Sequence, residues 1–127
     1  MDARTTATRY GQAQVTSVDA KRLLLLVFDG GLRFLRQARE ALAADDLPQA
    51  AEAMRRAHAI VAELQATLDF ERGGDIAPTL YRLYDFMLHH LTVANAQRSA
   101  RHVDEVIAVL EPVAGAFRTI IEPARAA

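Results

Sequence analysis

The stretch that decides the fold runs from Gly73 to Leu91 and reads GGDIAPTLYRLYDFMLHHL. The paired glycines end the segment before them, and Asp75 is a good N-cap residue. Pro78 falls in a first helical turn, where its missing N–H has no helical partner in any case. These signals predict a helix that begins after Asp75 and ends near Gln97.

The apolar side chains of this helix fall into two stripes. Because each residue turns ~100° about the helix axis, the two stripes together cover an arc of roughly 160°. A face this wide has two interpretations: either the helix is wedged among several neighbours, or part of the face is kept for a partner. The first stripe is Ile76, Leu80, Leu83, Met87 and Ala94, and the second is Ala77, Tyr81, Tyr84, Leu88 and Leu91.

A first helix is expected over residues 20–43, with Asp19 as its N-cap. Its apolar residues recur at spacings of four and three, as in the seam of a helix bundle. Gly30 and Gly31 each cost a helix ~1 kcal/mol relative to alanine, so we expect them to allow close approach by another backbone, in the bundle or from a ligand. The seam residues are Leu24, Phe28, Gly31, Leu35, Ala38 and Leu42.

Two more helices complete the pattern. One should start at an aspartate N-cap just before Pro48 and run to about Glu71. The other should start after residues 98–99. Pro112 lies inside it and should bend or split it by removing one backbone hydrogen bond, and Pro123 should end it.

Four amphipathic helices joined by short turns predict an all-α fold, an antiparallel four-helix bundle. We assign the bundle domain to residues 19–123. Residues 1–18 are polar and threonine-rich, so we expect a short mobile N-terminal segment, and a loose tail over residues 124–127. A frayed terminus is the simple interpretation of the N-terminal segment. The sharper hypothesis is that Tyr10 and Val15 fold back into an apolar groove as a removable plug.

Composition narrows the classes of function. The chain has 127 residues, a formal net charge of −1 and no cysteine. This size predicts one domain, and this charge predicts no nucleic-acid footprint. The lack of cysteine excludes disulfides and thiolate chemistry and fits a cytoplasmic protein. The longest apolar run, Leu23 to Phe28, is far short of a membrane span, so we expect no membrane insertion.

Catalytic and metal-binding patterns are weak. A di-iron bundle needs a Glu-x-x-His pair on facing helices, and none occurs, so we expect no metal and no cofactor.

His58 raises the alternative of a histidine-phosphotransfer bundle. Such domains resemble each other around His-x-x-Lys-Gly, whereas residues 58–62 read HAIVA, without the lysine or the glycine. Ser17 and Ser99 have no base placed beside them, so we predict that the protein is not an enzyme.

What the sequence does offer is surplus apolar surface. An apolar groove on a small helical bundle is the physical basis of helix-in-groove recognition, and exposed apolar patches usually mark partners. The competing interpretation is that the four-helix core absorbs all of this surface, and for each residue a core role is at least equally favoured. The residues predicted to bind a partner are Leu25, Ile60, Leu64, Leu80, Tyr81, Tyr84 and Leu88.

Two blocks of sequence resemble the flagellar secretion chaperone FliS family. Residues 74–87 read GDIAPTLYRLYDFM, against the family pattern G-x-I-A-x-N-L-x-x-L-Y-D-Y-M. Residues 23–31 read LLLLVFDGG, against L-x-x-M-L-Y-D-G-A. The resemblance covers nearly the whole chain in order. At the start of the first helix the family has an Ala-Ser-Pro-Glu-type pattern, from which this chain departs with Ala20 for the proline and Lys21 for the glutamate. In the block of residues 74–87 it has Thr79 for the asparagine.

The resemblance implies a cytoplasmic chaperone that binds the disordered C-terminal segment of flagellin in apolar grooves. Such binding prevents premature polymerisation, supports secretion through a membrane-bound export gate and needs no ATP. The resemblance leaves open whether the free protein forms a homodimer. A generic helical adaptor for another cargo is the alternative function.

Overall fold

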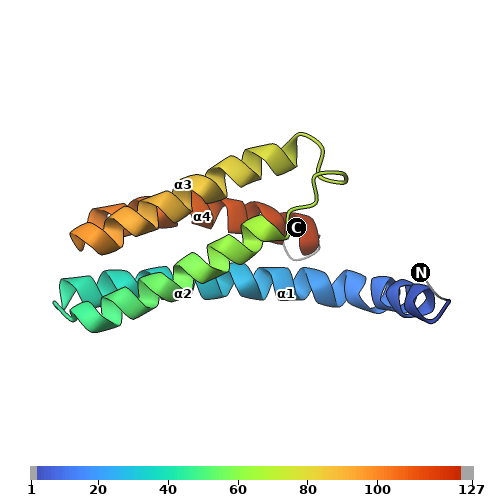
Figure 1. Ribbon diagram of the computed structural model, residues 1–127, viewed down its shortest axis with the longest axis horizontal. Coiled ribbons are helices and arrows are strands. Elements are labelled where there is room, and N and C mark those ends of the chain that lie inside the picture. Colours follow the sequence, from blue (N-terminus) through green and yellow to red (C-terminus); the bar gives the residue numbers. More distant parts are fainter. Residues whose placement is uncertain (1–2, 124–127) are drawn as a thin grey trace.

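The computed structural model describes the backbone of residues 3–123 and the side chains of residues 19–123. Helices that are adjacent in sequence contact each other, and α1 also contacts α4, so the four pack in a ring. Figure 1 shows that they alternate in direction and that the first part of α1 extends past the other helices. The predicted all-α antiparallel four-helix bundle is confirmed. The helices of the described chain are α1 (Ala3–Ala43), α2 (Leu47–Ala66), α3 (Ile76–Gln97) and α4 (Ala100–Ile121).

The first helix begins much earlier than the sequence predicts. α1 is continuous from Ala3, so Asp19 lies inside it and the predicted N-cap is wrong. The physical reason is that no proline and only one glycine, Gly11, precede Asp19, so nothing stops the helix from propagating toward the N-terminus. The side chains of Tyr10 and Val15 and the tail after residue 123 lie outside the described residues, so the plug, the mobile segment and the loose tail stay predictions.

The second helix ends earlier than predicted, at Ala66 instead of Glu71. The hydroxyl of Thr67 donates a hydrogen bond to the backbone carbonyl of Glu63 at 3.0 Å. Asp69 then turns the chain, because its Oδ1 accepts a hydrogen bond from the backbone N–H of Glu71 at 3.0 Å. The side chain of Asp69 thus holds the chain in a turn after α2, and apolar periodicity does not reveal this turn.

Two aspartates precede helices, as the sequence predicts, but only one caps with its side chain. Asp46 accepts a hydrogen bond from the backbone N–H of Gln49 at 3.3 Å, and Pro48 lies in the first turn of α2. Asp75 precedes α3 in a helical conformation and makes no capping hydrogen bond with its side chain. Gly74, with φ of +50°, instead makes the turn in the left-handed region that favours glycine.

The last helix passes through its internal proline. α4 begins after Ser99, whose hydroxyl accepts a hydrogen bond from the backbone N–H of His102 at 3.2 Å, and runs to Ile121. Pro112 does not split the helix. Pro112 and Ala108, four residues before it, are both exposed to solvent, so water can satisfy the carbonyl that loses its helical partner.

The core lies along the axis of the bundle and receives side chains from all four helices. Among the described residues it contains no buried polar or charged side chain. The ring of Phe28 stacks on that of Phe117 with centroids 5.2 Å apart, which ties α1 to α4. The largest fully buried side chains are Tyr84, Phe28, Leu35, Met87, Leu91, Leu110, Val61, Val103 and Val106.

The two adjacent glycines of α1 differ in the space around them. A Cβ added at Gly31 would lie 3.2 Å from Cγ2 of Ile60 and 3.5 Å from Cδ2 of Leu110. A Cβ added at Gly30 would come no closer than 3.6 Å to Ile60, an ordinary contact. The expected close approach is therefore present at Gly31, but side chains of α2 and α4 make it, not a neighbouring backbone.

We expect Gly31→Leu to destabilise the domain and Gly30→Ala to stabilise it. A leucine at position 31 must displace Ile60 and Leu110, and overpacking of this kind costs about 1–3 kcal/mol. An alanine at position 30 keeps ordinary contacts and gains up to ~1 kcal/mol of helix propensity. Urea unfolding of both variants gives the two free energies. Equal values for the two would contradict this account of the α1 contacts.

Candidate partner-binding site

The seven residues predicted to bind a partner differ in exposure. Four of them are buried in the bundle: Leu25, Leu64, Leu80 and Tyr84. Two are half-buried and pack against the core: Ile60 and Leu88. Tyr81 alone is well exposed, at 44%. The two stripes of α3 are thus largely wedged among neighbouring helices, and partner contact by any of the seven stays a prediction.

Other apolar side chains are more open than the predicted set, and the sequence reasoning missed them. One feature of the sequence does indicate that some of these side chains are exposed. Residues 23–26 are four consecutive leucines, which spread over roughly 300° of a helix, so they cannot all face one core. The large apolar residues exposed besides Tyr81 are Leu23 (60%), Leu26 (64%), Phe70 (52%), Ile76 (66%), Phe86 (44%) and Ile120 (74%).

Most of these exposed residues belong to segments at one end of the bundle. Figure 1 shows that α2 ends, α3 begins and α4 ends at the same end, where α1 passes on toward the N-terminus. The rings of Phe70 and Tyr81 lie here with centroids 6.0 Å apart. Gln65 of α2 donates a hydrogen bond to the backbone carbonyl of Tyr81 at 3.2 Å, which holds the start of α3 beside α2. We call this region the open end.

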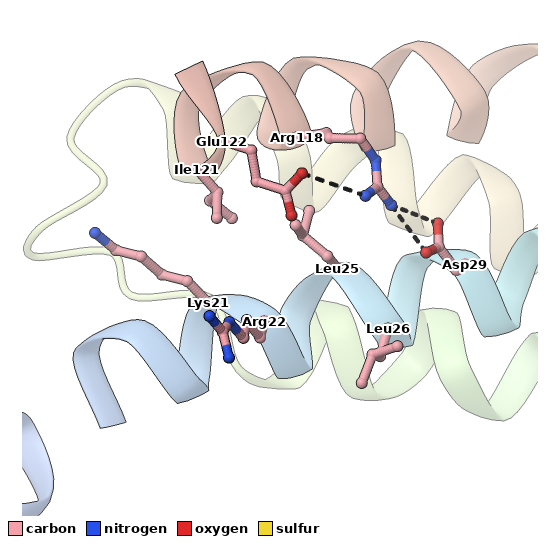
Figure 2. Close-up of a pocket in the computed structure, with 8 residues that line it drawn as sticks. All are labelled: Lys21, Arg22, Leu25, Leu26, Asp29, Arg118, Ile121 and Glu122. Atoms are coloured by element: carbon pink, nitrogen blue, oxygen red, sulfur yellow. Dashed lines mark hydrogen bonds and ion pairs between the residues drawn. The ribbon is translucent and has the colours of Figure 1, made fainter. Parts of the chain in front are cut away.

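An open pocket of about 480 Å³ lies at the open end, between α1 and the last turn of α4. Its apolar lining comes from Leu25 and Leu26 of α1 and from Ile121 of α4. Figure 2 shows the side chains of Leu25 and Ile121 pointing into the space between the two helices. Pockets of this volume are typical of ligand and peptide sites. We call it the α1/α4 pocket.

Charged groups stand at both ends of the α1/α4 pocket. At one end, Arg118 of α4 donates hydrogen bonds to both carboxylate oxygens of Asp29 at 2.8 Å, and it also lies 3.9 Å from Glu122. At the other end are Lys21 and Arg22, which make no ion pair within the part of the chain whose side chains are described. The pocket therefore combines apolar side chains, beside which the Glu122 carboxylate also lies, with two cations that make no ion pair with any described side chain.

A polar cluster joins α3 to α4 on another side of the bundle. Nε2 of His90 lies 2.5 Å from a carboxylate oxygen of Glu105, and this hydrogen bond holds the pKa of Glu105 below its usual range. The His90 ring stacks on Phe86 and lies 4.6 Å from the ring of His102. Contrary to the sequence-based expectation, Ser99 does have a base beside it, because its Oγ lies 2.6 Å from Nδ1 of His102.

This cluster has a structural explanation. The Ser99 hydroxyl is already engaged as the N-cap of α4, and His90 and Glu105 bridge two helices. No group of three or more metal-ligating side chains is found among the residues that the structure describes. His58, the residue behind the phosphotransfer alternative, is half-buried beside a smaller pocket of about 210 Å³ between α2 and α3.

No helix within residues 3–123 is both long enough and apolar enough to cross a membrane.

Comparisons with known proteins agree on one family. The family profile described as "Flagellar protein FliS" matches residues 3–124. The flagellar secretion chaperone FliSB of Pseudomonas aeruginosa is 38% identical over 99 residues, which are 78% of this chain and 79% of that protein. The flagellar secretion chaperone FliS of Salmonella typhimurium is 36% identical over 110 residues, 86% of this chain and 82% of that protein.

A solved structure, described as that of a flagellar chaperone from bacteria, has the same fold. It aligns with a TM-score of 0.81 over 96% of this chain and 99% of its own, at 19% sequence identity. The family profile and the two relatives confirm the resemblance seen in residues 23–31 and 74–87 at the level of the family. The whole described bundle takes part in the match. The chain belongs to the FliS family of flagellar proteins, whose relatives named above are secretion chaperones.

Proposed function

We propose that this protein is a cytoplasmic export chaperone that binds the disordered C-terminal segment of flagellin. Bound in apolar grooves as short amphipathic helices, the segment cannot polymerise early, and the complex can be delivered to the flagellar export gate. Membership of a family of secretion chaperones supports the class of activity. The single observation that carries the proposal is the open end, with its exposed apolar side chains and the α1/α4 pocket.

The energetics favour several apolar anchors over one. Burying one large apolar side chain contributes about 1.5–3 kcal/mol. Ordering a disordered segment opposes binding by about 2–5 kcal/mol or more. Two or three anchors on the chaperone, matched by as many on the guest, therefore leave a net favourable free energy. The open end offers that number of exposed side chains, whereas no single exposed residue suffices.

The open end also revises the choice of contact residues. Tyr81 and the half-buried Ile60 and Leu88 remain proposed contacts. The buried residues Leu64, Leu80 and Tyr84 serve the core, and Leu25 is reached only at the α1/α4 pocket. In their place we propose the exposed side chains Leu23, Leu26, Phe70, Ile76 and Ile120.

Two further elements of the proposal concern competition for this surface. If Tyr10 and Val15 plug the groove, the apparent affinity for flagellin falls by the fraction of plugged molecules. A homodimer of the free protein through the open end would compete in the same way. Deletion of residues 1–16 tests the plug. Analytical ultracentrifugation of the free chain tests the homodimer.

Titration calorimetry of the full chain with a synthetic C-terminal flagellin peptide tests the proposal. We expect saturable binding with one peptide per chain and a gain of helical circular dichroism in the complex, because the disordered guest folds on the apolar surface. A peptide of scrambled sequence and the same composition serves as the control. Absence of saturable binding by a folded chaperone, or equal binding of the scrambled peptide, would refute the proposed function.

A further inference from the structure

We propose that the α1/α4 pocket receives the chain end of the guest: its last apolar side chain together with its free C-terminal carboxylate. This inference rests on the proposed function, because it names the part of the flagellin segment that one part of the open end recognises. The segment in question is a chain terminus, so it always carries an α-carboxylate. Some surface of the chaperone must accommodate that charge beside apolar anchors.

The pairing of charges along α1 and α4 points to this pocket. Arg36 and Arg39 of α1 are bonded to acidic residues of α4, at 2.6 Å to Glu111 and 3.1 Å to Asp104. Farther along the same two helices, Arg118 is bonded to Asp29. Three arginines of this helix pair are thus matched by carboxylates of the facing helix, whereas Arg33 of α1 lies over the ring of Phe34.

At the open end, two neighbouring cations lack such a partner among the described side chains. Lys21 and Arg22 line the pocket and make no ion pair with any described side chain, while both carboxylates that line the pocket interact with Arg118. α1 is continuous through these positions, so the two cations project from a regular helix and not from a frayed first turn. The charge that would complete this arrangement is an anion supplied by a partner.

The apolar side chains that line the pocket define the rest of the occupant. Leu25, Leu26 and Ile121 form a surface that favours an aliphatic or aromatic side chain, and about 480 Å³ is ample for one such side chain and a carboxylate. A carboxylate placed in apolar surroundings without cations is costly, whereas charge-assisted hydrogen bonds to lysine and arginine offset that cost. Figure 2 shows the two kinds of surface next to each other, with Lys21 and Arg22 at one end and Ile121 beside Leu25.

An α-carboxylate matches this geometry well. It is joined directly to the backbone of the last residue, so it stays close to the final apolar side chain. If the guest is helical, its C-terminal end also carries the negative pole of the helix dipole, and that pole favours nearby cations. An acidic side chain in the middle of the guest has neither advantage. We therefore assign the pocket to the chain end.

The test is a two-by-two comparison of peptides and proteins. The flagellin peptide is made with a free C-terminal carboxylate and with a C-terminal amide, and each is titrated into the wild-type chain and into Lys21→Gln/Arg22→Gln. We expect the amide to bind the wild type about three- to tenfold more weakly, since the ion pairs are partly exposed to solvent. We expect that penalty to vanish in the double variant and to shrink at high salt.

A matched control removes the same net charge elsewhere. Arg55→Gln/Arg56→Gln acts on α2, where both arginines bind Glu52, and should keep the full amide penalty. Thermal unfolding of each double variant establishes that it is folded, and the single variants Lys21→Gln and Arg22→Gln replace the double variant if it is not.

The outcomes separate this inference from the proposed function. Equal affinities of the two peptides for the wild type would overturn the carboxylate site while leaving flagellin binding intact. A penalty that persists in Lys21→Gln/Arg22→Gln would place the carboxylate elsewhere and overturn the assignment to this pocket. Failure of both peptides to bind the wild type would refute the proposed function itself.

Discussion

Phe28→Ala should lower the free energy of unfolding by about 3–5 kcal/mol, because it leaves a cavity in the core. Phe28 is fully buried, and its ring stacks on Phe117 between α1 and α4. Domains of this size are stable by only about 5–15 kcal/mol, so the loss is a large share of the total. Urea unfolding followed by circular dichroism at a helical wavelength measures the difference.

The matched control for Phe28→Ala lies on the same helix. Leu26 is 64% exposed, so Leu26→Ala should change the free energy of unfolding by less than about 0.5 kcal/mol. Since Leu26 also lines the α1/α4 pocket, the same variant should weaken peptide binding. A Phe28→Ala variant no less stable than Leu26→Ala would show that the packing described for this part of α1 is incorrect.

Tyr84 and Tyr81 lie less than one helical turn apart on α3, but replacement by alanine should cost far more stability at Tyr84 than at Tyr81. Tyr84 is 2% exposed, and burial raises its pKa to about 12. Tyr84→Ala should cost about 3–5 kcal/mol of stability, as other large-to-small changes of buried aromatic residues do. Tyr81 is 44% exposed, and Tyr81→Ala should cost less than about 1 kcal/mol.

Binding of the flagellin peptide should show the reverse order. Tyr81→Ala removes an exposed aromatic anchor at the open end, and aromatic anchors of this kind often contribute more than 1 kcal/mol, so we expect about tenfold weaker binding. Tyr84→Phe keeps the buried ring and serves as the folded variant at position 84, and it should bind as the wild type does. If Tyr84→Phe weakens binding while Tyr81→Ala does not, Tyr84 is a contact residue and the proposed surface is wrong.

Local signals in the sequence were enough for the number, order and direction of the helices. The N-cap at Asp46, the glycine pair before α3 and the serine before α4 each act within a few residues, so they can be read from the chain directly. The same kind of reading failed at two boundaries. The start of α1 has no stop signal to find. After α2, the side chain of Asp69 accepts backbone hydrogen bonds from Glu71 and Arg72, which hold the chain in a turn.

Periodicity placed Phe28, Leu35 and Ala38 in the core, but the tertiary structure decided which of the surplus apolar residues are buried and which are open. Leu25 and Leu26 are adjacent and chemically identical, yet the first is 4% exposed and the second 64%. Periodicity gives the direction of a side chain about the axis of its own helix, but exposure depends on which neighbours lie in that direction. The α1/α4 pocket needs Leu25 and Ile121 to face the same space, and no local pattern encodes that arrangement of residues so far apart in the sequence.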